Sequence, residues 1–351
     1  MSMATLSSVT KNSGTGLLWV LFCAAMTMAL VTPAHGQWRD PAEQFGPELR
    51  RFTDPLDGSV FESRSLLSTN GLGGYDSDGC TYAKGQQPRT FAVATSPSTG
   101  FSARIADFPA ALSAAQKEKV RAVLAEFGSV ESILALPASG GYEIAAAVAR
   151  ALGRSHFEVG ELYLGGAWTV RDTIVGFLPG LQGPGDTWRK MSEVSDLAQK
   201  QTEDRARTRA MFDLARISHR GGFFHERETF LELLSTFPDA GLGAMEKRTE
   251  FRSRVAEEQR FLHLARREFQ AGRVRGEGSA RDRSYYLYLL GDIDRRSGDF
   301  EAAAMALQST AADKDTAEEV AVLARDILRV LEVQDKTGAG YKQPRERGEV
   351  K

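Results

Sequence analysis

The chain has 351 residues, of which 42% are hydrophobic and 26% are charged, and its formal net charge is −2. This is the composition of an ordinary globular protein with room for one large or two modest domains. A chain this close to neutrality lacks the basic surface of a nucleic-acid-binding protein, so we expect no nucleic acid among its partners.

Residues 1–36 are typical of a signal peptide. Lys11 precedes an apolar run over 17–31, and Ala34 and Gly36 are the small residues that cleavage before residue 37 requires. The apolar run is shorter than the roughly 20 residues of a membrane-spanning helix. We therefore predict an exported protein of the periplasm or cell envelope, which would touch a membrane only if the segment were retained as an anchor.

Cys80 is the only cysteine that remains after this cleavage, because Cys23 lies within the apolar run. The mature protein then forms no internal disulfide, and packing of its core must hold the fold. A single cysteine is more often buried than reactive.

A small β-rich module is predicted over 53–108, after a polar linker at 37–52. The module is rich in Gly, Ser, Thr and Asp, and its short apolar runs at 65–69 and 90–95 are bounded by glycine-containing turns. Such runs between turn residues predict short strands.

A helical region is predicted over 109–335, and a charged, glycine-rich tail at 336–351 is predicted to be disordered. The first helix begins at a capping box formed by Ser113 and Gln116. A single long helical pattern is predicted from Trp188 to His219.

The clearest helical pattern is a hairpin over 285–310. Apolar residues recur there at i, i+3, i+4 and i+7 in two sets, Tyr286, Leu289, Leu290 and Ile293, then Phe300, Ala303, Ala304 and Leu307. Gly298 and Asp299 suit the turn between them, and Gly291 removes a side chain where the helices cross. The unit is similar to a tetratricopeptide repeat, which needs neighbours of its own kind to bury its apolar faces.

An echo of this hairpin lies 76 residues upstream, where Leu214-Ala215 and Gly222-Phe223-Phe224 match Leu290-Gly291 and Gly298-Asp299-Phe300. Together these features predict a mainly α fold, namely a tetratricopeptide-like array of helical hairpins with a small N-terminal β-rich ribbon.

Several motifs resemble the bacterial domain of unknown function 2225 family. The residues that carry the resemblance are 55–61, 68–70, 73–78, 80–85, 96–101 and 107–108 in the β-rich module, and 288–292 and 295–298 in the helices. The resemblance covers most of the mature chain and implies a zinc-ribbon-like module followed by tetratricopeptide-like helices.

The zinc-ligand positions that the resemblance implies have lost their cysteines. Asp54 stands before Pro55, Ser96 before Pro97, and Thr99 before a glycine. Hydroxyl groups are poor zinc ligands. We therefore expect the ribbon without its metal, and no cofactor.

Asp76-Ser77-Asp78-Gly79 resembles the start of a calcium loop, but position 87 holds Gln where such a loop ends in Glu. Turn formation is the preferred interpretation. The same module nevertheless concentrates ligand-capable residues, and we keep a metal-binding or catalytic site of Asp54, Asp76, Asp78 and Cys80 as the alternative hypothesis.

The sequence assembles no catalytic constellation, so the favoured function is a non-catalytic module whose concave helical face binds a protein or peptide. A third hypothesis is an envelope scaffold in which the ribbon itself is the docking surface.

Overall fold

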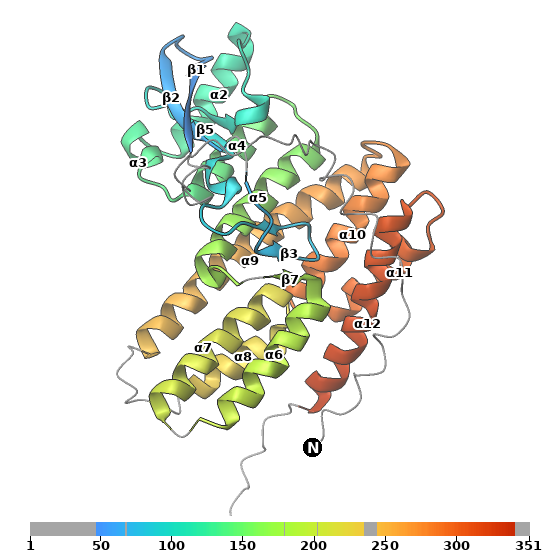
Figure 1. Cartoon of the computed structure of the whole chain (residues 1–351). Helices are drawn as coiled ribbons and strands as arrows, with labels where there is room; N and C mark the ends of the chain where they lie inside the picture. Colours follow the sequence, from blue (N-terminus) through green and yellow to red (C-terminus); the bar gives the residue numbers. More distant parts are fainter. Residues whose placement is uncertain (1–46, 67–68, 179, 202, 235–243, 341–351) are drawn as a thin grey trace, which may run out of the picture. The chain divides into compact units, whose positions relative to one another are not determined.

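The computed structural model describes residues 47–66, 69–178, 180–201, 203–234 and 244–340 (Figure 1). The fold is mainly α with a few small sheets, which confirms the predicted fold class. The predicted signal peptide at 1–36 lies outside the described residues, as does 341–351 of the predicted tail. Among the described helices, none combines the length and the apolar character that crossing a membrane requires.

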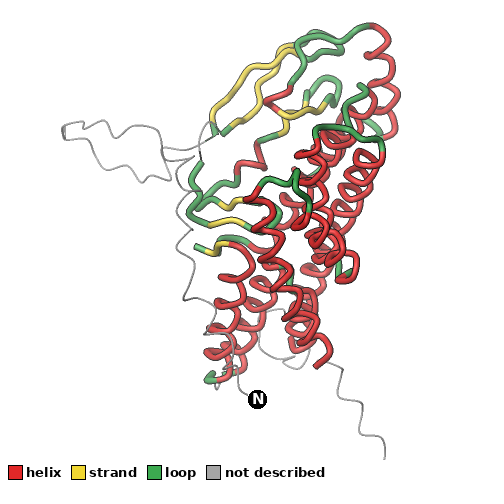
Figure 2. Tube along the Cα trace, turned by 90° about the vertical axis from the view of Figure 1, so that its right-hand side faces the viewer, coloured by secondary structure: helices red, strands yellow, loops and turns green. Residues whose placement is uncertain are grey.

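The N-terminal part contains a β-hairpin and two smaller sheets. Strand β1 (Glu48–Thr53) pairs antiparallel with β2 (Val60–Ser65), and β5 (Val93–Thr95) pairs antiparallel with β6 (Ser102–Arg104). Strand β3 (Gly74–Tyr75) pairs antiparallel with β4 (Thr81–Tyr82) and parallel with β7 (Leu181–Gln182). In Figure 2 the strands lie toward one side of the helices.

The strand boundaries differ from those predicted. Strand β1 occupies part of the predicted linker, because Phe52 pairs with Phe61 and both rings pack against Phe108 with centroids 5.0 and 5.8 Å away. Of the strand predicted at 65–69, Ser65 is the last residue of β2, Leu66 and Thr69 lie outside the strands, and 67–68 lie outside the described residues. The pattern at 90–95 divides into a 3-10 helix (Pro88–Phe91) and β5, because Pro88 begins a helical turn.

The helices run from α2 to α12. Their bounds are α2 Ala114–Glu126, α3 Val130–Leu134, α4 Ala138–Ala151, α5 His156–Val175, α6 Gly183–Gln199, α7 Asp204–Gly221, α8 Phe224–Leu233, α9 Ala244–Val274, α10 Ala280–Arg296, α11 Phe300–Ala312 and α12 Glu318–Gly340. The predicted capping box of Ser113 and Gln116 is present at α2. The single helix predicted from Trp188 to His219 is wrong, because the chain leaves helical geometry between α6 and α7.

Helices α5 and α9 form the central contact of the helical part. Glycines on α5 allow their close approach, since a Cβ atom at Gly160 or Gly166 would lie 2.4 Å or 2.7 Å from the ring of Phe269 or Phe261 on α9. Both rings are fully buried. Because α9 packs on α5, which lies well before it in the sequence, the helices are not stacked in simple sequence order.

Two helical hairpins appear where the sequence echo predicted them. Helices α7 and α8 are joined at Gly222 (φ 70°), and α10 and α11 are joined at Gly298 (φ 85°), both in the left-handed conformation that glycine tolerates. A Cβ atom at Gly291 would lie 2.7 Å from Leu307, as expected for a helix crossing without a side chain.

Candidate functional site

The turn between β3 and β4 carries three of the four residues of the alternative site. The Asp76 N–H donates to the Cys80 carbonyl (2.8 Å), and the Gly79 N–H donates to the Asp76 carbonyl (3.1 Å). The Asp78 carboxylate accepts the Cys80 N–H (3.2 Å), and Gly79 has a φ of 82°. This local geometry explains the Asp and Gly residues here and confirms the interpretation as a turn.

Asp76, Asp78 and Cys80 lie together, with one ligand atom of each within 4.8 Å of the others. Asp54 does not join them. Its carboxylate instead accepts hydrogen bonds from the Thr99 hydroxyl (2.6 Å) and the Leu56 N–H (2.6 Å) in a different turn. Of the four residues of the alternative hypothesis, the structure brings Asp76, Asp78 and Cys80 together and places Asp54 in a different turn.

Arginine side chains from separate helices converge on the two aspartates. Arg171 of α5 places Nη1 3.1 Å from Asp76 and 2.8 Å from Asp78. Arg220 of α7 donates from Nε to Asp76 (3.0 Å), and Arg296 of α10 lies 3.7 Å from the same carboxylate. Three helices thus hold one turn.

Ser77, at the tip of the turn, is bound by α10. Its hydroxyl donates to Asp292 (2.9 Å), and its carbonyl accepts the Tyr288 hydroxyl (2.5 Å). Asp292 in turn accepts from Arg295 (2.8 Å) and Arg296 (2.8 Å). The tip is therefore fixed through its backbone as well as its side chain.

Helix α9 completes the arrangement through Glu258. One carboxylate oxygen accepts Arg171 Nε (2.8 Å), and the other lies 2.6 Å from His219 Nε2. Burial acts to raise the pKa of Glu258, but Arg171 and His219 outweigh it and lower the pKa to about 2. Glu258 therefore stays ionised beside Arg171.

These residues form a buried ion-pair network of four carboxylates and four guanidinium groups. Its members are Asp76, Asp78, Glu258, Asp292, Arg171, Arg220, Arg295 and Arg296, and none is more than 4% exposed. Charges this deeply buried are tolerated only when they are paired and hydrogen-bonded. Equal numbers of the two signs make the network neutral as a whole.

The arginines of α10 also connect the two hairpins. Arg295 Nη1 donates to the carbonyls of Gly221 (2.7 Å) and Gly222 (3.1 Å), and Arg296 Nη1 donates to the carbonyl of Arg220 (3.0 Å). The two guanidinium groups therefore bind backbone carbonyls at the C-terminal end of α7. Arg220 and Arg296 occupy equivalent positions in the two echoes, and both reach Asp76.

The network suits structural fixation better than chemistry. Burial raises the pKa of the Cys80 thiol to about 12, so the thiolate that metal binding or nucleophilic attack needs is disfavoured. A cation between Asp76 and Asp78 would meet the guanidinium of Arg171. Arg171 Nη2 is buried and has no hydrogen-bond partner among the described residues. The unsatisfied polar atom at this site is therefore a hydrogen-bond donor, which cannot act as a ligand for a cation.

A second cluster contains Asp54, Ser96 and Thr99, the positions at which the family resemblance predicted lost zinc ligands. Residues 54–58 and 96–100 form two turns of the same design, in which the first carbonyl accepts the N–H of the glycine that ends the turn (2.9 Å in both). Gly58 and Gly100 have φ values of 80° and 76°. We call these segments the paired turns.

The side chains of the paired turns face one another. Thr99 and Ser98 of one turn donate to Asp54 of the other, at 2.6 and 3.3 Å, and the Ser96 hydroxyl lies 3.0 Å from that of Ser98. Asp57 precedes Gly58 as Thr99 precedes Gly100, so Asp57 is the fourth equivalent position, and it was not among the predicted site residues. The two turns are therefore joined by hydrogen bonds. The carboxylates and hydroxyls at these four positions do not form a ligand set that fits zinc.

The paired turns make a testable prediction. Replacing Asp54, Asp57, Ser96 and Thr99 together by cysteine should create a site that binds about one zinc ion per chain, because four thiolates in facing turns suit tetrahedral coordination. Elemental analysis and a cobalt-substituted absorption spectrum would measure this. A control variant with cysteines at Asp54 and Asp57 only should bind more weakly, and equal binding by both variants would contradict the pairing of the turns.

The chain matches no family model, no curated protein and no solved structure. The family resemblance therefore stays a prediction.

Proposed function

We propose that this chain is a non-catalytic protein-binding module of the cell envelope. In this proposal the buried ion-pair network fixes a metal-free β-rich ribbon to a tetratricopeptide-like helical array, and the array presents a surface to a partner. The ion-pair network supports a non-catalytic role, because Asp76 and Asp78 are both paired with arginine and the Cys80 thiol is buried.

The observation that carries the binding role is an open hollow of about 600 Å³ along the first half of α9. The residues that line it are Met245, Glu246, Thr249, Glu250, Ser253, Arg254 and Glu257. Three glutamates against one arginine give the hollow a negative charge, and Met245 at its end is 47% exposed. A partner segment with basic residues and an apolar contact for Met245 complements this surface.

Site-specific photo-crosslinking in cells tests the proposal. A crosslinking residue at Thr249 should yield one dominant protein adduct, whereas the same residue at exposed Gln308 on α11 should not. Reversing charge with Glu246→Lys and Glu250→Lys should reduce the adduct at least about tenfold, because like charges oppose a basic partner. Equal adducts at Thr249 and Gln308, or an adduct indifferent to charge reversal, would overturn the proposal.

A second candidate function is a metal centre at Asp76, Asp78 and Cys80, favoured by the mutual distances of their ligand atoms. The guanidinium shared between the aspartates opposes it. Metal content separates the two candidates.

A further inference from the structure

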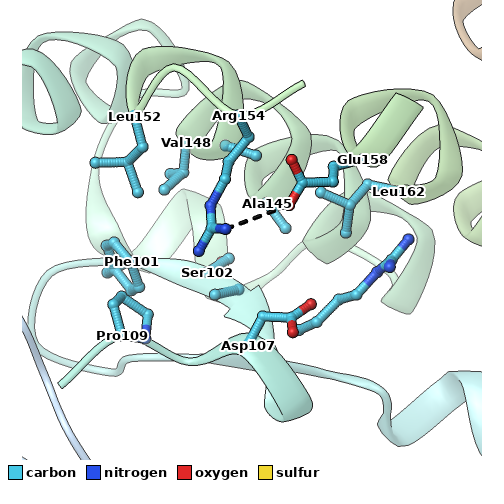
Figure 3. A pocket seen from close by; sticks show the side chains of 13 residues that line it. Phe101, Ser102, Asp107, Pro109, Ala145, Val148, Leu152, Arg154, Glu158 and Leu162 are labelled. Carbon is cyan, nitrogen blue, oxygen red and sulfur yellow. Dashed lines mark hydrogen bonds and ion pairs between the residues drawn. The ribbon is translucent and has the colours of Figure 1, made fainter. Parts of the chain in front are cut away.

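A small cavity of about 60 Å³ lies between the end of the β-rich module, α4 and the start of α5 (Figure 3). Its mouth is open to solvent, because Asp107, Arg154 and Glu158 at its edge are all exposed. Figure 3 shows Arg154 extending across this opening toward Glu158. The walls are apolar and are formed by Phe101, Ala103, Pro109, Ala145, Val148, Ala149, Leu152 and Leu162.

The volume of the cavity limits what it can hold. A dry protein cavity of about 150 Å³ binds one benzene molecule, so a cavity of about 60 Å³ has room for roughly two to three carbon atoms. The isopropyl group of valine has this size, whereas a phenyl ring does not. A ligand that fits therefore carries a short aliphatic group and leaves its polar groups at the mouth.

The two carboxylates at the mouth differ in how they are engaged. Glu158 accepts hydrogen bonds from the Ser155 N–H (2.9 Å) and hydroxyl (2.8 Å) in the capping box that starts α5. The carboxylate of Asp107 forms no hydrogen bond and no ion pair within the part of the chain that the structure describes. A cationic group of a ligand at this mouth is therefore attracted to Asp107.

The two arginines that line the cavity also differ. Arg104 is bound to Glu161 at 3.0 Å, and Glu161 is held in turn by the Tyr286 hydroxyl at 2.7 Å. Arg154 lies 3.2 Å from Glu158, and the two side chains of this pair are 50% and 48% exposed. A pair this exposed contributes little to stability, so Arg154 can turn to the carboxylate of a ligand at little cost.

We propose that the cavity binds a free α-amino acid with a short aliphatic side chain, for which valine has the best size. The aliphatic group fills the cavity, the α-carboxylate binds Arg154 and the α-ammonium group binds Asp107. An unpaired carboxylate and a loosely held guanidinium group at the mouth of one apolar cavity complement both charges of the zwitterion. The cavity is separate from the hollow on α9, so each proposal can fail without the other.

Methyl NMR on the full chain tests the proposal, because alanine, valine and leucine methyl groups line the cavity. Valine should shift the methyl signals of Val148, Ala149 and Leu152 with a Kd of about 1 mM or below, and should leave those of Leu307 on α11 unchanged. Glycine leaves the cavity empty and phenylalanine exceeds its volume, so each should bind at least tenfold more weakly than valine. Absence of these shifts, or equal binding of all three amino acids, would overturn the proposal.

Analogues of valine that lack one charge test the two contacts at the mouth. Valine amide lacks the carboxylate that Arg154 should bind, and N-acetylvaline lacks the ammonium group that Asp107 should bind. Each analogue should therefore bind at least tenfold more weakly than valine. An analogue that bound as tightly as valine would show that the site does not recognise the zwitterion.

Matched variants locate the site. Arg154→Gln should weaken valine binding at least tenfold, while Arg189→Gln, which breaks a similarly exposed i,i+4 pair on α6, should leave it unchanged. Ala149→Leu fills the cavity and should abolish binding, while Ala147→Leu on the same helix, which does not line the cavity, should not. Thermal melts establish that the four variants fold. Equal affinity for valine in Arg154→Gln and the unaltered chain would contradict the proposal.

Discussion

Replacing Arg171 with methionine should lower the free energy of unfolding by about 3–5 kcal/mol, because the change leaves buried carboxylates without their cation. Arg171 is 0% exposed and contacts Asp76, Asp78 and Glu258 at 2.8–3.1 Å. Methionine keeps much of the side-chain volume, so the loss reports charge more than packing. Urea-induced unfolding followed by circular dichroism measures it.

The control for this variant is Arg189→Met on α6. Arg189 is paired with Glu193, but its side chain is 63% exposed, and removing such a pair should cost about 1 kcal/mol or less. If Arg171→Met lowered the free energy of unfolding as little as Arg189→Met does, the ion-pair network would not be what holds the ribbon to the helices.

Acidification should unfold the protein through the same network. Glu258 has its pKa lowered from 4.5 to about 2 by Arg171 and His219 against the opposing effect of burial, so as the pH falls the unfolded chain takes up this proton first. Stability from Glu258 is complete above about pH 5 and decreases toward about pH 2, by roughly 3 kcal/mol in total. Burial also lowers the pKa of His219, so the free energy of unfolding decreases further as the pH falls below 6.5.

Unfolding free energies measured across this pH range would test the assignment. A Glu258→Gln variant should be less stable at neutral pH and should show a flatter pH profile, because the titrating group is gone. A Glu126→Gln variant, altered at an exposed carboxylate on α2, should keep the profile of the unaltered chain. Parallel profiles for the unaltered chain and Glu258→Gln would assign acid sensitivity to other groups.

The parts of the fold that the sequence predicted are those set by local patterns. Gly298 and Gly222 end their helices as their spacing indicated, and Gly291 allows the expected crossing against Leu307. The break between α6 and α7 was missed because residues 200–203 contain neither Gly nor Pro. The helical periodicity of the sequence shows no interruption at these residues.

The site could be predicted only in its local part. Asp76, Asp78 and Cys80 were recognised as a cluster because they share one turn, but their partners are distant in sequence. Arg220 lies 144 residues from Asp76, and Asp292 lies 215 residues from Ser77. Arginine at a helix end ordinarily indicates a solvated or dipole-stabilising residue, so nothing in the local pattern marked Arg220 or Arg296 as buried. The recurrence of Arg220 and Arg296 at equivalent positions of the two echoes was the one available signal.

The most direct test of the central claim, that the Asp76–Cys80 turn is held by guanidinium groups rather than by a metal, is the metal content of the purified chain together with its thermal melt with and without chelator. The account predicts no stoichiometric metal and a melting temperature that chelator does not change. Stoichiometric zinc or calcium whose removal lowers the melting temperature would contradict it and would place a metal centre at Asp76, Asp78 and Cys80.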